Sequence, residues 1–449
     1  MKHSSIRLLL ILCLALFLPL MAEGVEDPAV PFDLRKAIDE ALSNNPELKA
    51  MRDVVRAKES RARAEGSLDD PAFKVELEDL SKDRPLNIAP NDAMQTRYTI
   101  SQMLPFPGKL SLKEKIAVKE AMAERARLAS KELEIKALLK EAYFDYAYLA
   151  ASIRITEEIR ELLSYMARIA SARYSVGQAS QQDVIKINLE AAMLNNDLIT
   201  FGAEKDIAAT RLKSLLSRDQ DSAIGGPTDI PREKVEVDAA MLMNAALKNN
   251  PDIRMSEFEA EAGAASADLA KKNYYPDFMV GFAPIQRDNR FDSFDLMFQV
   301  NIPLWRGKYD SLSEEASSNL EAARFRALAG KNRKALEVKE AALQVEAADR
   351  IRTLYETSLL PQVNLSFDAA LKNYQAGKMD FLMLLDTGRQ LKRIRLEHLK
   401  TVLDYCKRVA ALERATGVEM KTASSQRDNP PAASKVKGGE GGLVNGETK

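Results

Sequence analysis

The chain repeats one large stretch of its own sequence, and this duplication constrains the fold more than any other feature. The run Ala41-Leu42-Ser43-Asn44-Asn45-Pro46 returns 205 residues later as Ala246-Leu247-Lys248-Asn249-Asn250-Pro251. At the same offset, Pro71-Ala72-Phe73 returns as Pro276-Asp277-Phe278. Self-similarity over such a distance predicts two copies of one unit, each with the same order of helices and strands.

The N-terminus predicts export from the cytoplasm. A basic start precedes an apolar run from Leu8 to Met21, and small residues follow at Ala22 and Gly24. This order is typical of a secretory signal peptide, whereas a membrane-spanning helix takes about 20 apolar residues. We therefore predict a signal peptide over residues 1–24, with cleavage after Ala22 or Gly24.

The composition argues against a catalytic domain. Beyond the signal, one histidine (His398) and one cysteine (Cys406) are left, so we expect neither a histidine metal site nor an intrachain disulfide. The net charge of −1 offers no basic footprint for nucleic acid. No acid–base pair, nucleophile motif or phosphate-binding loop is recognisable, so we expect no enzyme and no cofactor. Charged residues at 29% and aromatic residues at 6% are typical of long helices.

Two long helices are predicted, at 109–172 and 308–372. The first contains neither proline nor glycine, and at ~1.5 Å per residue each would reach roughly 95 Å. Apolar residues follow each other at helical spacing in both, as in a coiled-coil seam. They are Ile135, Leu139, Ala142, Tyr146, Leu149 and Ile153 in the first helix, and Leu343, Ala347, Ile351 and Leu354 in the second. Such rods belong to a stalk or to the wall of a helical tube.

Two short segments precede each rod, at about 71–80 and 93–104 and at about 276–286 and 292–303. In all four, apolar and polar side chains alternate, as in transmembrane strands that line a wet lumen. A hairpin on a soluble core would show the same alternation. Four strands cannot close a barrel, and each unpaired edge group in lipid costs several kcal/mol, so membrane strands would require association. The apolar positions are Phe73, Val75, Leu77, Tyr98, Ile100, Phe278, Val280, Phe282, Phe294, Leu296, Phe298, Val300 and Ile302.

Each rod ends at a repeated Tyr-x-x-Gly turn, Tyr174 to Gly177 and Tyr374 to Gly377, and a second helix follows it. These signals divide the chain into a first repeat, a second repeat and a polar tail that we predict to be disordered. The first repeat spans 25–235, with its tip at 173–180, a return helix at 181–217 and then a linker. The second repeat spans 236–418, with its tip at 373–379 and a return helix at 380–416. The tail covers 419–449.

This order of elements, present twice, resembles the TolC family of outer-membrane efflux proteins. The likeness is carried by Glu40-Ala41-Leu42 with Pro46, by the corner Pro105-Phe106-Pro107-Gly108-Lys109 and by the two Tyr-x-x-Gly tips, and it covers about 32–418. It implies a mainly α, internally duplicated fold, in which long coiled-coil helices form an α-barrel. Four strands from each of three chains would form a 12-stranded transmembrane β-barrel.

The resemblance also implies a location and partners. The protein would be a homotrimer in contact with outer-membrane lipid, with its helical barrel in the periplasm. A periplasmic adaptor (membrane fusion) protein and an inner-membrane pump would bind it, and no nucleic acid would. Its expected function is the passive exit duct of a tripartite efflux pump. The outer-membrane component of a type I protein-secretion system uses the same fold and stays an alternative, as does a non-pore periplasmic coiled-coil adaptor.

Residues near the tips receive roles from the same resemblance. Alignment on Gly377 places Met383 and Asp386 in the periplasmic constriction, where a ring of three Asp386 carboxylates would favour cations. Asp183 matches an aspartate that bonds the tyrosine matched by Tyr374, which would form a latch between the two hairpins. The expected adaptor-docking residues are Arg173, Tyr174, Gly177, Gln178, Gly377 and Lys378.

A proline distinguishes the second rod from the first. Pro361 lies within the second rod, where the first has Glu161 at the 200-residue offset. Proline removes one backbone hydrogen bond from a helix and permits a kink. We therefore predict a kink at Pro361 and expect the second hairpin to move when the tip opens.

Overall fold

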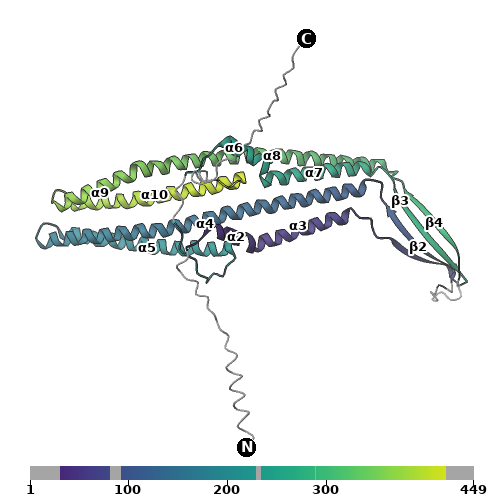
Figure 1. Ribbon diagram of the computed structural model, residues 1–449, viewed down its shortest axis with the longest axis horizontal. Coiled ribbons are helices and arrows are strands. Elements are labelled where there is room, and N and C mark those ends of the chain that lie inside the picture. The colour runs from purple at the N-terminus through teal and green to yellow at the C-terminus, as the bar shows by residue number, and fades with distance from the viewer. Residues whose placement is uncertain (1–30, 81–89, 91–92, 229–233, 289, 421–449) are drawn as a thin grey trace, which may run out of the picture.

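The structure, a computed structural model, describes residues 31–80, 90, 93–228, 234–288 and 290–420. Long helices run side by side along the molecule, and the sheet lies at one end (Figure 1). The predicted signal peptide, and the predicted tail beyond residue 420, lie outside the described residues.

The two repeats contain the same elements in the same order. The first consists of α2 (Leu34–Asn44), α3 (Pro46–Glu65), β1 (Ala72–Leu80), β2 (Ala93–Leu104), α4 (Lys109–Ser175) and α5 (Gln181–Leu216). The second consists of α6 (Ala239–Asn249), α7 (Pro251–Lys272), β3 (Asp277–Arg287), β4 (Arg290–Asn301), α8 (Arg306–Leu354), the π-helical turn η1 (Tyr355–Leu359), α9 (Leu360–Gln375) and α10 (Phe381–Thr416).

The duplicated Asn-Asn-Pro motif separates consecutive helices in both repeats. The Asn45 Oδ1 atom accepts the backbone N–H of Glu47 at 2.9 Å, and Asn250 Oδ1 accepts that of Asp252 at 2.9 Å. A proline stands in the first turn of each following helix, where its missing N–H costs nothing. Each asparagine therefore caps the N-terminus of a helix, and this local role accounts for the repeated motif.

The second rod is not the single α-helix that we predicted over 308–372. It changes from α8 to the π-helical turn η1 after Leu354 and continues as α9, with Pro361 in the first turn of α9. Proline offers no N–H to the preceding turn, and a π-helical turn is one way for a helix to absorb that loss. The first rod, α4, is continuous to Ser175, so Arg173 and Tyr174 are helical rather than part of the turn.

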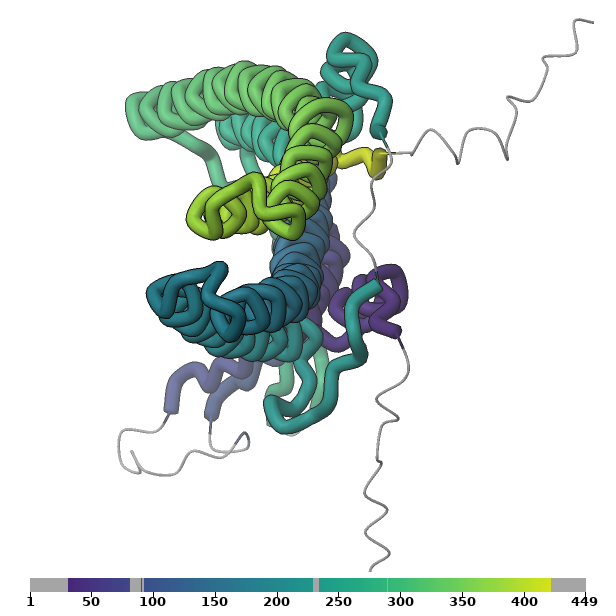
Figure 2. Tube along the Cα trace, turned by 90° about the vertical axis from the view of Figure 1, so that its left-hand side faces the viewer, coloured from purple at the N-terminus to yellow at the C-terminus, as the bar shows by residue number. Residues whose placement is uncertain are grey.

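The rods form one curved layer. In the half nearer the tips, α8 packs on α10, α10 on α4, and α4 on α5, whereas in the half nearer the sheet the order is α3, α4, α7, α8. Figure 2 shows these helices as an arc in a view along the molecule. The layer therefore has two edges, with α8 on one side and α3 and α5 on the other.

The two predicted coiled-coil seams have different environments. On α4, Ile135, Leu139 and Ala142 are fully buried in the central core. On α8, Leu343, Ile351 and Leu354 are each at least half exposed, and the buried positions are instead Val338, Ala342 and Val345. The second seam thus lies on a free edge of the layer, where it would pack only against another molecule.

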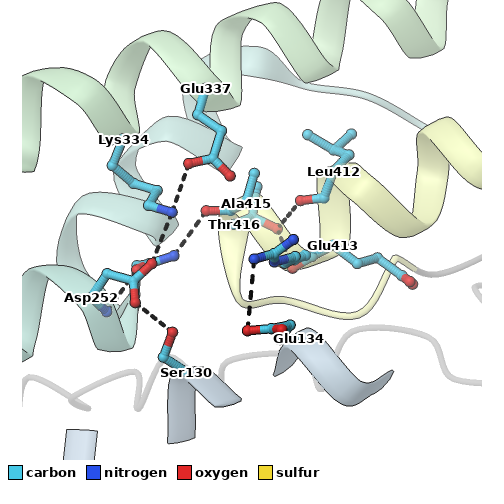
Figure 3. Close-up of polar contacts among 11 residues, drawn as sticks. Ser130, Glu134, Asp252, Lys334, Glu337, Leu412, Glu413, Ala415 and Thr416 are labelled. Atoms are coloured by element: carbon cyan, nitrogen blue, oxygen red, sulfur yellow. Dashed lines mark hydrogen bonds and ion pairs between the residues drawn. The ribbon is translucent and has the colours of Figure 1, made fainter. Parts of the chain in front are cut away.

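A polar junction joins the repeats near the middle of the rods. The Asp252 carboxylate of α7 accepts the Ser130 hydroxyl of α4 and lies 3.0 Å from the Lys334 ammonium of α8, which also contacts Glu337 at 2.7 Å (Figure 3). Burial opposes ionisation of Asp252, but the Ser130 and Lys334 hydrogen bonds hold its pKa below the usual range. Asp252 therefore stays charged and holds three helices together.

A second polar cluster fixes the sheet to the rods. At the start of α4, the Lys109 ammonium donates to Asp277 Oδ1 at 2.8 Å and to the Tyr275 carbonyl at 3.1 Å. The backbone N–H of Phe106 donates to the same Asp277 oxygen at 2.7 Å, and the Phe106 ring stacks on Tyr275. Because Lys109 and Phe106 belong to the first repeat and Asp277 to the second, this corner also ties the repeats together.

Candidate functional site

The sheet separates apolar from polar side chains by face. Its four antiparallel strands lie in the order β1-β2-β3-β4. Phe73 faces Ile100, Ile100 faces Phe282, and Phe282 faces Leu296, so the predicted apolar positions form rows across the strands. These four side chains are all exposed. The sheet thus presents a broad apolar face with nothing packed over it in the described chain.

The opposite face of the sheet is charged. Arg97 of β2 lies 2.7 Å from Glu78 of β1 and 3.3 Å from Asp295 of β4. Within the described residues, β1 and β4 each have a neighbouring strand on one side only. No described helix combines the length and the hydropathy needed to cross a membrane.

Both tips use the same turn. Gln178 N–H donates to the Arg173 carbonyl at 2.8 Å, and Lys378 N–H donates to the Asn373 carbonyl at 2.9 Å. Gly177 and Gly377 have φ of 74° and 76°, a left-handed conformation that favours glycine and ends the helix. The Tyr-x-x-Gly pattern is therefore a helix C-cap, and it holds both hairpins in the same turn.

The expected docking residues are not equivalent in the two tips. Tyr174, Gly177, Gln178, Gly377 and Lys378 are exposed, as docking requires, and Arg173 is half-buried. In contrast to Tyr174, Tyr374 is only 3% exposed, and its ring packs edge-on against Phe381.

The predicted latch between Asp183 and Tyr374 is not formed as a hydrogen bond. Asp183 instead accepts the Ser180 N–H at 3.2 Å and completes a capping box at the start of α5. The buried Tyr374 hydroxyl has no hydrogen-bond partner in the described part of the chain. Burial raises the Tyr374 pKa, Arg173 lowers it, and the nearby Asp183 charge raises it.

Arg173 makes the contact between the tips that Asp183 does not. Its Nη1 atom donates to the Tyr374 carbonyl at 2.5 Å, and its guanidinium lies 4.9 Å from the centre of the Tyr374 ring. A residue expected at a docking surface therefore joins α4 of the first hairpin to α9 of the second.

The expected constriction residues lie on one face of α10. Met383 is exposed, and the Asp386 side chain is 75% exposed. Asp386 lies 3.6 Å from Arg389 one turn further along the helix. The charge of the exposed Asp386 carboxylate is thus partly balanced by Arg389.

Three ion pairs behind the tip join the hairpins, and we name them the tip ion pairs: Glu190–Arg389, Asp197–Lys392 and Glu158–Arg395. The Glu190 carboxylate accepts from Arg389 at 2.7 and 2.8 Å, and its side chain is only 9% exposed. Arg395 lies 3.3 Å from Glu158. Each cation comes from α10 and each carboxylate from α4 or α5, so these pairs hold the second hairpin against the first.

The tip ion pairs were not among the residues predicted from the sequence. The available signal was a basic residue at every third position of α10, at 389, 392 and 395, which places the three on neighbouring turns. Their partners lie about 200 residues away and carry no pattern of their own.

The described residues contain no cluster of three or more His, Cys, Asp or Glu side chains placed to hold a metal ion. Burial raises the pKa of the Cys406 thiol to about 12, so this cysteine stays protonated and unreactive.

A curved single layer of rods, continued by a sheet with one apolar and one charged face, is the architecture of a membrane-channel subunit. A family model described as outer membrane efflux protein matches residues 37–218 and 242–418. The chain belongs to the outer membrane efflux protein family.

Individual relatives agree with this assignment. The chain is 22% identical over 404 residues to the cobalt-zinc-cadmium resistance protein CzcC of Cupriavidus metallidurans, covering 87% of this chain and 91% of that protein. It is 23% identical over 434 residues to the solvent efflux pump outer membrane protein SrpC of Pseudomonas putida, covering 90% and 88%. The solved outer-membrane channel OprN has the same fold, with a TM-score of 0.73 at 16% identity, over 86% of this chain and 89% of that one.

Proposed function

We propose that the chain forms, as a homotrimer, the passive exit duct of a tripartite efflux pump. The observation that carries this proposal is the open, two-faced sheet, because β1 and β4 offer free edges beside an exposed apolar face. In lipid each unpaired edge group costs several kcal/mol, so the edges must pair between copies. Four strands from each of three chains give a closed 12-stranded barrel with apolar side chains outside and charges in the lumen.

The rods support closure of a ring through a second head-to-tail contact. One edge of the layer carries an exposed apolar stripe on α8, and the other carries one on α5. A head-to-tail contact between these two stripes repeats around a ring, as does the pairing of β4 with β1. The stripes are Leu336, Leu343, Ile351 and Leu354 on α8, and Ile185, Leu189, Ile199 and Ile207 on α5.

The proposed partners follow from the family and from its named members. SrpC is the outer-membrane protein of a solvent efflux pump, which supports a pump and a periplasmic adaptor as partners of this chain. We assign adaptor docking to the exposed tip residues Tyr174, Gln178 and Lys378. We further propose that the second hairpin moves on opening, because the π-helical turn before Pro361 interrupts only the second rod.

Electron microscopy of the protein extracted from outer membranes in detergent tests the assembly. We expect a three-fold hollow cylinder with a tube of roughly 95 Å below a short barrel. A monomer, or a solid rod that leaves the membrane without detergent, would contradict the duct and favour the coiled-coil adaptor. The type I secretion alternative gives the same image, so it requires a deletion strain: loss of a secreted protein supports secretion, and sensitivity to small toxic compounds supports efflux.

Asp386 is the residue to which we assign ion selectivity at the constriction. Three Asp386 carboxylates around a narrow opening would attract cations, and Met383 adds no charge. We expect Asp386→Asn to lower the cation-to-anion permeability ratio by about an order of magnitude in a planar bilayer. Asp368→Asn removes one carboxylate from α9 without touching the proposed ring and is the control. If the cation-to-anion permeability ratio were the same in both variants and in the wild type, Asp386 would not line the conduction path.

A further inference from the structure

We propose that the end of β4 and the start of α8 bind the headgroups of anionic phospholipids at the periplasmic boundary of the membrane. This inference rests on the proposed membrane location of the sheet and adds a ligand class to it. We name the surface the β4 rim, and it consists of Ile302, Leu304, Trp305, Arg306 and Lys308.

The β4 rim continues the apolar face of the sheet beyond the last strand residue. Ile302, Leu304 and Trp305 are all exposed, and Trp305 is exposed to 81%. They follow the exposed Leu296 and Phe298 of β4 along the chain, so the apolar face ends at Trp305. Indole rings favour the boundary between hydrocarbon and headgroups, where the ring is dry and the N–H is wet. The sheet therefore meets the headgroup layer at this point.

Two basic residues, Arg306 and Lys308, follow directly where the apolar face ends at Trp305. Arg306 and Lys308 are exposed, and the described residues place no carboxylate within ion-pair distance of either. Their recorded neighbours are aromatic: Arg306 lies 5.9 Å from the Tyr274 ring, and Lys308 lies 5.8 Å from the Tyr309 ring. An aromatic ring leaves the cation its hydrogen-bond donors, which a phosphate can accept.

Comparison of the two repeats shows why Lys308 has no carboxylate partner. Lys109 occupies the corresponding place in the first repeat, and there Asp277 and the Tyr275 carbonyl bind its ammonium. The first repeat has Ala72 where the second has Asp277, so the equivalent carboxylate is absent for Lys308. At the other end of the sheet, Arg287 is paired with Asp292 at 3.3 Å. At the periplasmic end of the sheet, the described residues therefore leave Arg306 and Lys308 without a carboxylate partner.

The position and the positive charge of Arg306 and Lys308 together favour an anionic lipid headgroup as the ligand. Basic side chains just outside an apolar surface attract anionic lipid headgroups, and the attraction acts within a Debye length of the bilayer, about 8 Å at physiological ionic strength. The flexible stems of Arg306 and Lys308 can lie along Trp305 and Leu304 while their charges reach the phosphate layer. A zwitterionic headgroup carries its own cation and would gain less from this surface.

The chain itself contains the reporter for a test, because Trp305 is its only tryptophan. We reconstitute the protein in phosphatidylcholine vesicles that contain an equal small fraction of brominated phosphatidylcholine or brominated phosphatidylglycerol, and we measure quenching of Trp305 fluorescence. We expect brominated phosphatidylglycerol to quench at least about threefold more strongly, because each basic residue adds to its local concentration. The excess should disappear in about 1 M salt.

Two double variants separate the β4 rim from general surface charge. Arg306→Gln with Lys308→Gln should make the two brominated lipids quench equally. Arg326→Gln with Lys339→Gln removes the same charge from exposed positions further along α8 and should keep the wild-type preference.

The outcomes distinguish this inference from the proposed function. Equal quenching by both lipids in the wild type would overturn lipid selection, and pairing of Arg306 and Lys308 with Asp69 and Asp70 of an adjacent copy, just before its β1, would then explain them. A preference that survives in Arg306→Gln with Lys308→Gln would also overturn it. Quenching by neither lipid would contradict the membrane location itself.

Discussion

We expect Phe298→Arg to prevent the protein from assembling in the outer membrane. Phe298 lies in the middle of β4, is 68% exposed and faces Val280 across the strands on the apolar side of the sheet. An arginine facing lipid near the bilayer midplane costs about 2–4 kcal/mol, and a trimer incurs that cost three times. A total of about 6–12 kcal/mol equals the whole stability of an ordinary domain, so the barrel should not form.

The next residue provides the matched control. Gln299 lies one position along β4, so its side chain points to the charged face, opposite Met279. Gln299→Arg places the same side chain in the lumen, where water and carboxylates accept it, and we expect normal assembly. The amount of trimer in outer-membrane fractions, seen on gels without heating, measures both variants. If the two variants assembled equally well, the apolar face would not face lipid.

The strands could be predicted because the period-two alternation of apolar and polar residues matches the two faces of the sheet. Period-two alternation is a local property, and the predicted apolar residues that lie within the strands, such as Phe73 and Leu296, share one face of the sheet. The order of elements, present twice, then carried the resemblance to a known family, and the resemblance implied the three-chain barrel that alternation alone could not give. The helical seams show the limit, because Ile135 and Ile351 have the same spacing pattern but only Ile135 is buried. A seam repeats in the same way whether its partner is in the same chain or in another copy.

The tips show a different limit. The two Tyr-x-x-Gly turns share their backbone geometry, since glycine conformation is a local matter, yet Tyr174 is exposed and Tyr374 is buried. What buries Tyr374 is Phe381 and the neighbouring hairpin, which the motif does not contain. The hydrogen bond between Asp183 and Tyr374 is absent for a local reason that the sequence does show. Ser180 and Asp183 have capping-box spacing, so the Asp183 carboxylate was already engaged by its own helix.

The tip ion pairs could not have been predicted from one sequence, because oppositely charged residues are abundant on every rod. Their structural value comes from burial: Glu190 is nearly enclosed between the hairpins, and a buried charge that loses its partner is costly. Arg389 also lies 3.6 Å from Asp386, so the cation that pairs with Glu190 also contacts the residue that we assign to the constriction. Charge at Glu190 should therefore control whether the tip opens.

We expect Glu190→Arg to open the tip. The substitution sets two cations against each other at a site that is nearly closed to solvent, and breaking such a pair costs about 3–5 kcal/mol in each copy. Moving a two-state equilibrium from 1:99 to 99:1 takes about 5.5 kcal/mol, which three copies together exceed. Single-channel recording in a planar bilayer should show rare openings for the wild type and long openings for Glu190→Arg.

Charge exchange shows whether the pair itself is responsible. Glu190→Arg combined with Arg389→Glu restores an attractive pair in the reverse sense and should return the channel to rare openings. Glu204→Arg makes the same charge change on an exposed face of α5, away from any ion pair among the described residues, and should leave opening unchanged. Long openings in the exchanged variant, or none in Glu190→Arg, would show that the hairpins are held closed by something other than this pair. The tip would then depend on Arg173 and its contact with Tyr374, since that contact also joins the two hairpins.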